Sequence, residues 1–263
     1  MEQFRKFPRT YHLFEVQKGR MARDDLLLDK TDAKPFYTLP VTVEEKIDGS
    51  NLGLSLEPID DGTTSNGNGS SGNSPTTRRI LAQNRSHYVT SQSHGQFKAL
   101  DTWINEHYDA LYRILSPNYI LFGEWLYAKH SIHYDRLPGY FVAFDVYDRT
   151  REAYLSVAER NRRLKGSGIP IIKSLVRDEV LGDRKRYEQL LETRSEYSLG
   201  PNVKVEGVYV RVDDPQTGLL KHRCKIVRPD FIQTVDTSGH WMTKEVVKNQ
   251  IDFEWLYSDH DQD

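Results

Sequence analysis

The sequence contains a single cysteine, Cys224, among 263 residues. It therefore excludes an intramolecular disulfide and a cysteine-based zinc site, and it favours a reducing compartment. No apolar run approaches the roughly 20 residues that cross a membrane. No apolar segment follows Met1, so we expect no signal peptide. These absences predict an intracellular protein, cytoplasmic or nuclear, without a membrane partner, and we expect a monomer.

The sequence also lacks an excess of either charge, with 36 basic and 38 acidic residues and a formal net charge of −2. A polyanionic partner would therefore need a local basic face rather than a whole-protein attraction. Candidates are residues 160–165, 184–186 and 221–228, although a solvated helix or loop face explains the first two equally simply. The composition is that of a globular protein large enough to bury a core.

Periodicity predicts a mixed α+β chain, mostly antiparallel because strand follows strand with short turns, and a single domain. Alternating apolar residues, or runs rich in aromatic residues or valine, predict strands at 41–47, 52–56, 79–83, 119–127, 140–147, 203–212 and 219–227. Helical spacing and capping residues predict helices at 97–115, 156–165 and 245–256, and one or two helices within 178–194. Residues 60–77, rich in Gly, Ser, Asn and Thr, are predicted to form a flexible insertion in a hairpin.

The clearest chemistry lies where the first predicted strand ends, in Lys46-Ile47-Asp48-Gly49-Ser50-Asn51. Side chains alternate across a strand, so Lys46 and Asp48 share a face, and Gly49 permits a tight bend beside them. A nucleophilic lysine must lose its proton, which needs burial or nearby cations, whereas Asp48 alone would act against this. The alternative is a surface lysine that precedes a turn.

Other strands supply matching charges. Lys221, Arg223 and Lys225 alternate along one strand, and such a row of cations suits the phosphates of a nucleotide. Glu124 and Glu206 each lie within an apolar run beside a glycine, as an acid at a site or on a solvated face would. A glycine at such a position also suggests the close approach of a ligand.

Six short elements occur in a fixed order: Lys46-x-Asp48-Gly49, Arg85-Ser86, Phe122-Gly-Glu124, Phe144-Asp145-Val146, Glu206-Gly207-Val208 and Arg223-Cys-Lys225. As an ordered set they resemble the motifs of the covalent nucleotidyltransferases, which comprise ATP- or NAD-dependent polynucleotide ligases and mRNA capping enzymes. The resemblance runs from about residue 44 to residue 228.

Within that superfamily the sequence is most similar to RNA ligases of the second phage type and their bacterial and eukaryotic relatives. Asn51 stands where DNA ligases and capping enzymes usually carry arginine. Residues 128–134 and His240-Trp241 also resemble this branch. Arg223 departs from the lysine of many relatives, which puts the geometry at its phosphate in question. The insertion at 60–77 is a second departure.

The resemblance implies an α+β nucleotidyltransferase domain, of the ATP-grasp-like adenylylation type, with two mainly antiparallel sheets flanked by helices. This domain would span residues 35–230. Residues 1–34 would form an N-terminal extension packed on the core, and residues 231–263 a short helical tail without an OB-fold.

The resemblance also implies an ATP-dependent reaction with Mg²⁺ or Mn²⁺ on RNA with 5′-phosphate and 3′-hydroxyl ends, including nicked duplexes. Lys46 would take AMP from ATP and pass it to the 5′-phosphate, and the 3′-hydroxyl would then displace it. The implied nucleotide contacts are Glu45, Arg85, Glu124, Phe144, Arg223 and Lys225. The implied metal ligands are Asp48 and Glu206, and Asn51 would act on the RNA ends.

Other functions stay open at this stage. A DNA ligase or a capping-type guanylyltransferase would share the same motifs. A non-catalytic module that binds nucleotide or RNA could keep the fold, although the intact motif set argues against it. His130 and His133 lack a nearby third ligand, so we do not expect a zinc site there.

Overall fold

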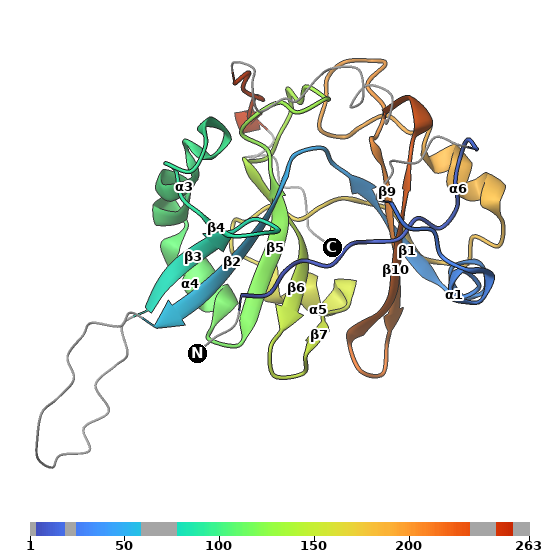
Figure 1. Cartoon of the computed structure of the whole chain (residues 1–263), viewed down its shortest axis with the longest axis horizontal. Coiled ribbons are helices and arrows are strands. Elements are labelled where there is room, and N and C mark those ends of the chain that lie inside the picture. Colours follow the sequence, from blue (N-terminus) through green and yellow to red (C-terminus); the bar gives the residue numbers. More distant parts are fainter. Residues whose placement is uncertain (1–3, 19–24, 59–77, 232–245, 255–263) are drawn as a thin grey trace, which may run out of the picture.

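The structure, a computed structural model, describes residues 4–18, 25–58, 78–231 and 246–254 and contains two antiparallel sheets (Figure 1). The first has the order β10-β9-β1-β8 and the second the order β4-β3-β2-β5-β6-β7. The first sheet consists of β1 (Val41–Lys46), β8 (Ser174–Glu179), β9 (Gly207–Asp214) and β10 (Leu219–Val227). The second consists of β2 (Ser50–Pro58), β3 (Arg78–Gln83), β4 (Tyr88–Val89), β5 (Tyr119–Trp125), β6 (Phe141–Asp148) and β7 (Ala153–Tyr154). The predicted α+β class with two antiparallel sheets is confirmed.

Short helices flank both sheets. They are α1 (Lys30–Ala33), α2 (Pro35–Thr38), α3 (Leu100–Glu106), α4 (Tyr108–Leu115), α5 (Val157–Leu164) and α6 (Arg184–Leu190), with a 3-10 turn, η1, at Gly95–Phe97. In Figure 1, α3 and α4 lie beside β2 and β3, whereas α1 and α6 flank the other sheet. Ser156 caps α5 as predicted, since its hydroxyl accepts a hydrogen bond from the backbone N–H of Glu159. Among the described residues, every helix is too short or too polar to span a membrane.

Two predicted helices were wrong in extent. The helix expected at 97–115 is divided at His107, whose ring stacks on Trp103 at 4.5 Å and whose Nδ1 lies 2.8 Å from the Trp103 carbonyl oxygen. The N-terminal part of the helical segment expected at 178–194 belongs instead to the end of β8, because residues of that strand pair with β1. Helix α6 begins only after Asp183, which caps it.

The helix expected at 245–256 is also wrong over the described residues 246–252, which are extended. Isolated bridges pair Lys248 with Ala128 and Ile251 with Leu137. The Asn249 side chain donates to the carbonyl oxygens of Leu126 and Ala128, so contacts with a distant segment replace those within a helix. Residues 60–77 and His240-Trp241 lie outside the described part of the chain.

Each sheet buries its own core. Leucines 52, 54 and 56 of β2 pack with residues of α3, α4, β5 and β6, because strand alternation turns them toward those helices. Valines of β1 and β9 pack with residues of α2 and α6 on the other side. The chain passes directly from the first sheet to the second between Lys46 and Ser50. The lysine motif therefore lies where the two sheets meet.

The N-terminal segment contacts both sheets. Phe7 packs against Phe122 of β5 and Phe144 of β6, with ring centroids 5.0 and 5.3 Å apart. Further along, the Leu13 N–H donates to the carbonyl oxygen of Lys225 in β10 at 2.9 Å. Figure 1 shows this dark-blue segment running from the side of the second sheet to β10. The segment thus passes along the boundary between the sheets.

Candidate active site

A cavity of about 620 Å³ lies between the two sheets. Most of the residues that the sequence singled out line it, and they come from both sheets and from the turn after β3. These are Glu45, Lys46, Asn51, Arg85, Glu124, Phe144 and Lys225. The fold therefore gathers residues that are up to 180 positions apart in the chain (Glu45 to Lys225) into one site.

Lys46 is the last residue of β1 and is paired with Gly207 of β9. A Cβ atom at Gly207 would lie 2.3 Å from the carbonyl oxygen of Ile226, so only glycine permits β9 and β10 to approach this closely. The preceding residue, Glu206, receives hydrogen bonds from Lys46 Nζ at both carboxylate oxygens, at 2.6 and 2.7 Å. The strand pairing thus places the lysine directly against a carboxylate.

The electrostatics keep Lys46 charged in the free protein. Burial by itself would lower the pKa of Lys46, but the carboxylates of Glu206, Glu124 and Asp48 together raise it above its usual value. Burial raises the pKa of Glu124 to about 8 and that of Glu206 to about 7, although Lys46 opposes both shifts. A nucleophilic role for Lys46 therefore requires that something offset these carboxylates.

Glu206 is not among the residues that line the cavity, whereas Asn51, Arg85 and Glu124 are. Asn51 of β2 is paired in register with Glu124 of β5, so the two backbones are neighbours at the cavity wall. Arg85 lies in the turn between β3 and β4, where the Asn84 side chain accepts hydrogen bonds from the N–H groups of Ser86 and His87. That turn holds Arg85 close enough to Glu124 for the guanidinium charge to lower the pKa of Glu124.

Glu45, in the cavity wall, is fully buried. Its carboxylate accepts hydrogen bonds from the Ser195 hydroxyl at 2.5 Å and from the Glu196 N–H at 3.2 Å. Burial nevertheless raises its pKa to about 7, against the effect of these bonds. A buried carboxyl near neutrality can accept a hydrogen bond when ionised and donate one when protonated.

Phe144 is held through its backbone by two arginines. Its carbonyl oxygen accepts hydrogen bonds from Arg160 of α5 at 2.6 Å and from Arg211 of β9 at 3.3 Å. The Arg160 guanidinium also forms an ion pair with Glu44 of β1 at 2.6 Å. These contacts join both sheets and α5 around a residue of the cavity wall.

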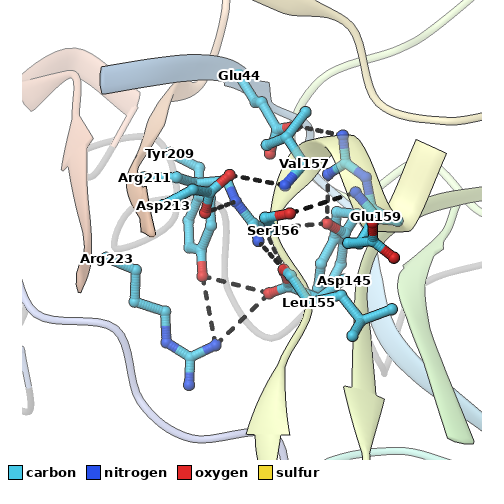
Figure 2. A network of polar contacts seen from close by, with 12 residues as sticks. Glu44, Asp145, Leu155, Ser156, Val157, Glu159, Tyr209, Arg211, Asp213 and Arg223 are labelled. Atoms are coloured by element: carbon cyan, nitrogen blue, oxygen red, sulfur yellow. Dashed lines mark hydrogen bonds and ion pairs between the residues drawn. The ribbon is translucent and has the colours of Figure 1, made fainter. Parts of the chain in front are cut away.

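Figure 2 shows the neighbouring part of this network, in which Asp145 binds Arg211 on one side and faces Tyr209 and Arg223 on the other. Arg223 Nη1 lies 3.5 Å from the Asp145 carboxylate, and its guanidinium lies 4.2 Å from the centre of the Tyr154 ring. Arg223 is not among the residues that line the cavity. Its expected contact with a phosphate stays a prediction.

Asp48 does not line the cavity either. One of its carboxylate oxygens accepts hydrogen bonds from the N–H groups of Ser131 and Ile132, at 2.7 and 3.0 Å, and its own N–H donates to the Tyr134 hydroxyl. Asp48 thus fastens the segment after β5 to the lysine motif. Its expected role as a metal ligand also stays a prediction.

The site suits a hydrated divalent cation better than a closed metal cage. Within the described ranges, no group of three or more His, Cys, Asp or Glu side chains is placed to hold a metal ion. The Glu206 carboxylate nevertheless lies close enough to Glu124 to raise the pKa of Glu124. Mg²⁺ is commonly bound through one or two carboxylates, with waters and substrate phosphates completing its coordination, and this pair fits that mode.

Sequence reasoning missed the cavity wall formed by the N-terminal segment. Phe7, Arg9, Thr10, Asp25 and Leu26 line the cavity although they lie outside the six motifs. Their residue types carry no motif, and the sequence predicted only that residues 1–34 would pack on the core. His130, noted in the sequence as a doubtful metal ligand, also lines the cavity, where it contacts Gln96 at 3.1 Å.

Comparisons with known proteins bear on the family and on the fold. The family model for RNA ligase matches residues 39–227. Among solved structures, a lysine-to-alanine variant of Naegleria gruberi RNA ligase with ATP and Mn has a TM-score of 0.54 and 19% identity, over 86% of this chain and 57% of that one. The same organism's ligase with pyrophosphate has a TM-score of 0.52 and 21% identity, over 88% and 64%.

At this identity the two structures show the fold alone, and the chain spans less than two thirds of the length of each. A search of curated proteins found no match. The family model covers well over half of the sequence and includes the lysine motif and every strand of both sheets. The chain therefore belongs to the RNA ligase family.

Proposed function

We propose that this protein is an ATP-dependent RNA ligase that joins 5′-phosphate and 3′-hydroxyl ends through a lysyl-AMP and an adenylylated RNA. The observation that carries the proposal is the position of Lys46. It lies in a cavity between two sheets with Glu206 against its Nζ and with Arg85, Lys225 and Phe144 around it. A cavity with cations and an aromatic ring suits a nucleoside phosphate.

Lys46 is the proposed nucleophile. Its Nζ attacks the α-phosphorus of ATP, so that a P–N bond forms, the bond to the bridging oxygen breaks and pyrophosphate leaves. Glu206 accepts hydrogen bonds from Nζ at both carboxylate oxygens and therefore orients it. Such transfers depend mainly on positioning and on neutralising phosphate charge, which Arg85 and Lys225 supply from the cavity wall.

The remaining cavity residues bind the nucleotide and the RNA. Phe144 stacks on the adenine, Glu45 contributes to reading the base, and Glu124 accepts hydrogen bonds from the ribose hydroxyls. Asn51 acts at the RNA ends. These roles follow from the family resemblance, and the common cavity supports them. We propose the adenylylation domain at residues 35–230, with the N-terminal segment completing its wall.

Glu206 and Asp48, with Glu124 beside Glu206, would hold Mg²⁺ or Mn²⁺, and Asp48 also supports the segment that follows β5. When bound, the cation would offset the carboxylates that keep Lys46 protonated and would polarise phosphate oxygens.

Covalent labelling tests the nucleotide part of the proposal. The protein is incubated separately with ATP, GTP and NAD, each labelled in the nucleoside monophosphate that would be transferred to the lysine. The label bound to the protein is then measured after denaturation. We expect label from ATP in the wild type and none in Lys46→Arg, which keeps a cation against Glu206 but is not a nucleophile. Label from GTP alone would favour a capping-type guanylyltransferase, and label from NAD alone an NAD-dependent ligase.

End joining tests the substrate. The panel contains nicked and single-stranded RNA and DNA, with 2′-deoxy substitutions next to the nick. An RNA ligase seals the RNA ends, whereas sealing of all-DNA nicks alone would contradict the RNA assignment. Absence of both label and sealing would favour a non-catalytic binding module.

A further inference from the structure

Lys225, a proposed phosphate contact, already binds an internal anion. Its Nζ donates a hydrogen bond to Asp25 Oδ1 at 2.7 Å, across 200 residues of sequence. The other oxygen of this carboxylate, Oδ2, lies 2.8 Å from Nε2 of the buried His12. Asp25 and Lys225 both line the cavity, and their side chains keep 25% and 18% exposure. The ion pair therefore lies at the surface of the site.

Backbone pairing fixes Asp25 in this position. Residues 11–13 run along the outer edge of β10. The Lys225 N–H donates a hydrogen bond to the Tyr11 carbonyl oxygen at 2.9 Å, and the Lys225 carbonyl oxygen accepts one from the Leu13 N–H. On its other side, His12 exchanges backbone hydrogen bonds with Leu26 and Leu28 at 2.7 and 2.9 Å. The residues immediately after Asp25 are thus tied to the strand that touches Lys225.

The charge of the pair belongs to the same electrostatic system as the lysine motif. Burial opposes ionisation of Asp25, but the hydrogen bonds from His12 and Lys225 hold its pKa well below the usual range, so the carboxylate is charged. Lys225 is close enough to Glu206 to lower the pKa of that carboxyl. A phosphate that reached Lys225 would therefore meet the Asp25 charge directly.

We propose that Asp25 competes with nucleotide phosphates for Lys225, which exchanges its hydrogen bond from the carboxylate to a phosphate oxygen when ATP or pyrophosphate binds. The lysine ammonium has three N–H groups on a flexible stem, so this exchange needs no movement of the backbone. Asp25 takes the hydrogen bond back as pyrophosphate leaves. The inference rests on the proposed function and adds that Asp25 weakens pyrophosphate binding and so favours its release.

The test compares Asp25→Asn with Asp32→Asn, measuring the affinity for inorganic pyrophosphate by calorimetry and the inhibition of lysyl-AMP formation by pyrophosphate. Both variants remove one negative charge from the N-terminal segment, but Asp32 is exposed on α1 and has no hydrogen bond or ion pair with Lys225 in the structure. We expect Asp25→Asn to bind pyrophosphate about three- to tenfold more tightly, the size expected for loss of a partly exposed competing ion pair.

A tightening by Asp25→Asn that Asp32→Asn does not share supports the exchange. Unchanged or weaker binding in Asp25→Asn would overturn it and would assign Asp25 a purely supporting role. A misfolded variant cannot imitate the expected result, because the expected change is a gain in affinity.

A double-mutant cycle with Lys225→Met separates exchange from simple charge repulsion. If Asp25 acts through Lys225, the gain from Asp25→Asn shrinks in the Lys225→Met background. An equal gain in both backgrounds would overturn the exchange. Failure of the proposed function is distinguishable, because the wild type would then form no lysyl-AMP in the absence of pyrophosphate.

Discussion

Replacing Arg160 with methionine should destabilise the fold and loosen the cavity wall. Arg160 is fully buried, pairs with the equally buried Glu44 at 2.6 Å and donates to the Phe144 carbonyl at 2.6 Å. Arg160→Met removes the ion-pair partner of the Glu44 carboxylate and leaves it buried. Breaking a buried ion pair in this way costs about 3–5 kcal/mol of the free energy of unfolding.

The structure also predicts how the loss is recovered. In the double variant Glu44→Met/Arg160→Met neither charge remains buried, and methionine fills most of the vacated volume. Replacing a buried ion pair by apolar residues of similar size is often neutral. The double variant should therefore regain most of the stability that Arg160→Met loses, although Phe144 keeps only its bond from Arg211.

Urea unfolding followed by tryptophan fluorescence measures both effects, with Arg162→Met as the control. Arg162 lies on the same helix, but its side chain is 74% exposed, so its replacement should leave the unfolding midpoint unchanged. A loss below about 1 kcal/mol in Arg160→Met, or a double variant no more stable than the single one, would refute the electrostatic argument. In variants that still fold, lysyl-AMP formation should show a raised KM for ATP, because Phe144 is less firmly held.

Three further predictions follow from the site. The stability of the free protein should fall as the pH rises from about 5 toward 8. In the folded state the pKa values of Glu124 and Glu206 are about 8 and 7, whereas both side chains titrate near the usual 4.5 in the unfolded chain. Over this pH range the folded state therefore binds more protons than the unfolded state, and raising the pH favours unfolding. Urea midpoints across this range check it, and Glu124→Gln should flatten the slope; a flat wild-type profile would contradict it. Gly207→Ala should cost about 1–3 kcal/mol, measured by thermal unfolding, because its Cβ would lie 2.3 Å from the Ile226 carbonyl oxygen; an unchanged midpoint would show that β9 and β10 can separate freely. Asp48→Ala should cost about 2 kcal/mol in metal-free buffer, because two backbone N–H groups of the segment after β5 lose their acceptor; a loss seen only with divalent cations would instead support metal binding.

The order of the motifs predicted much of the cavity wall. Lys46, Asn51 and Glu124 were predicted because each lies in or next to a short motif, and the order of such motifs along the chain does not depend on the lengths of the loops between them. The strands themselves were predicted by alternation, which reflects burial of one face and is a local property. Boundaries were less predictable: the backbone at His107 leaves the helical region, with φ −106° and ψ 12°, and so divides an otherwise helical pattern at a point that periodicity does not encode.

Other errors arose where distant contacts outweigh local preference. Residues 246–252 have a composition compatible with a helix, yet Asn249 binds two backbone carbonyl groups more than 120 positions away. Arg223 shares a strand face with Lys225, but it faces Asp145 and the Tyr154 ring, whereas Lys225 reaches the cavity. Alternation gives the face of a side chain, not its partner.

Residue types at fixed local spacings were sufficient to predict the family, the two-sheet α+β class and the lysine at the centre of the site. Which charges meet depends instead on contacts between distant segments of the folded chain. The tertiary structure placed Glu206 against Lys46, turned Asp48 toward the backbone of residues 131–132, and brought Asp25 to Lys225 from 200 residues away. The reason is physical: the pKa of a buried group depends on what lies within a few ångströms of it, and that is set by how the two sheets and the N-terminal segment pack together.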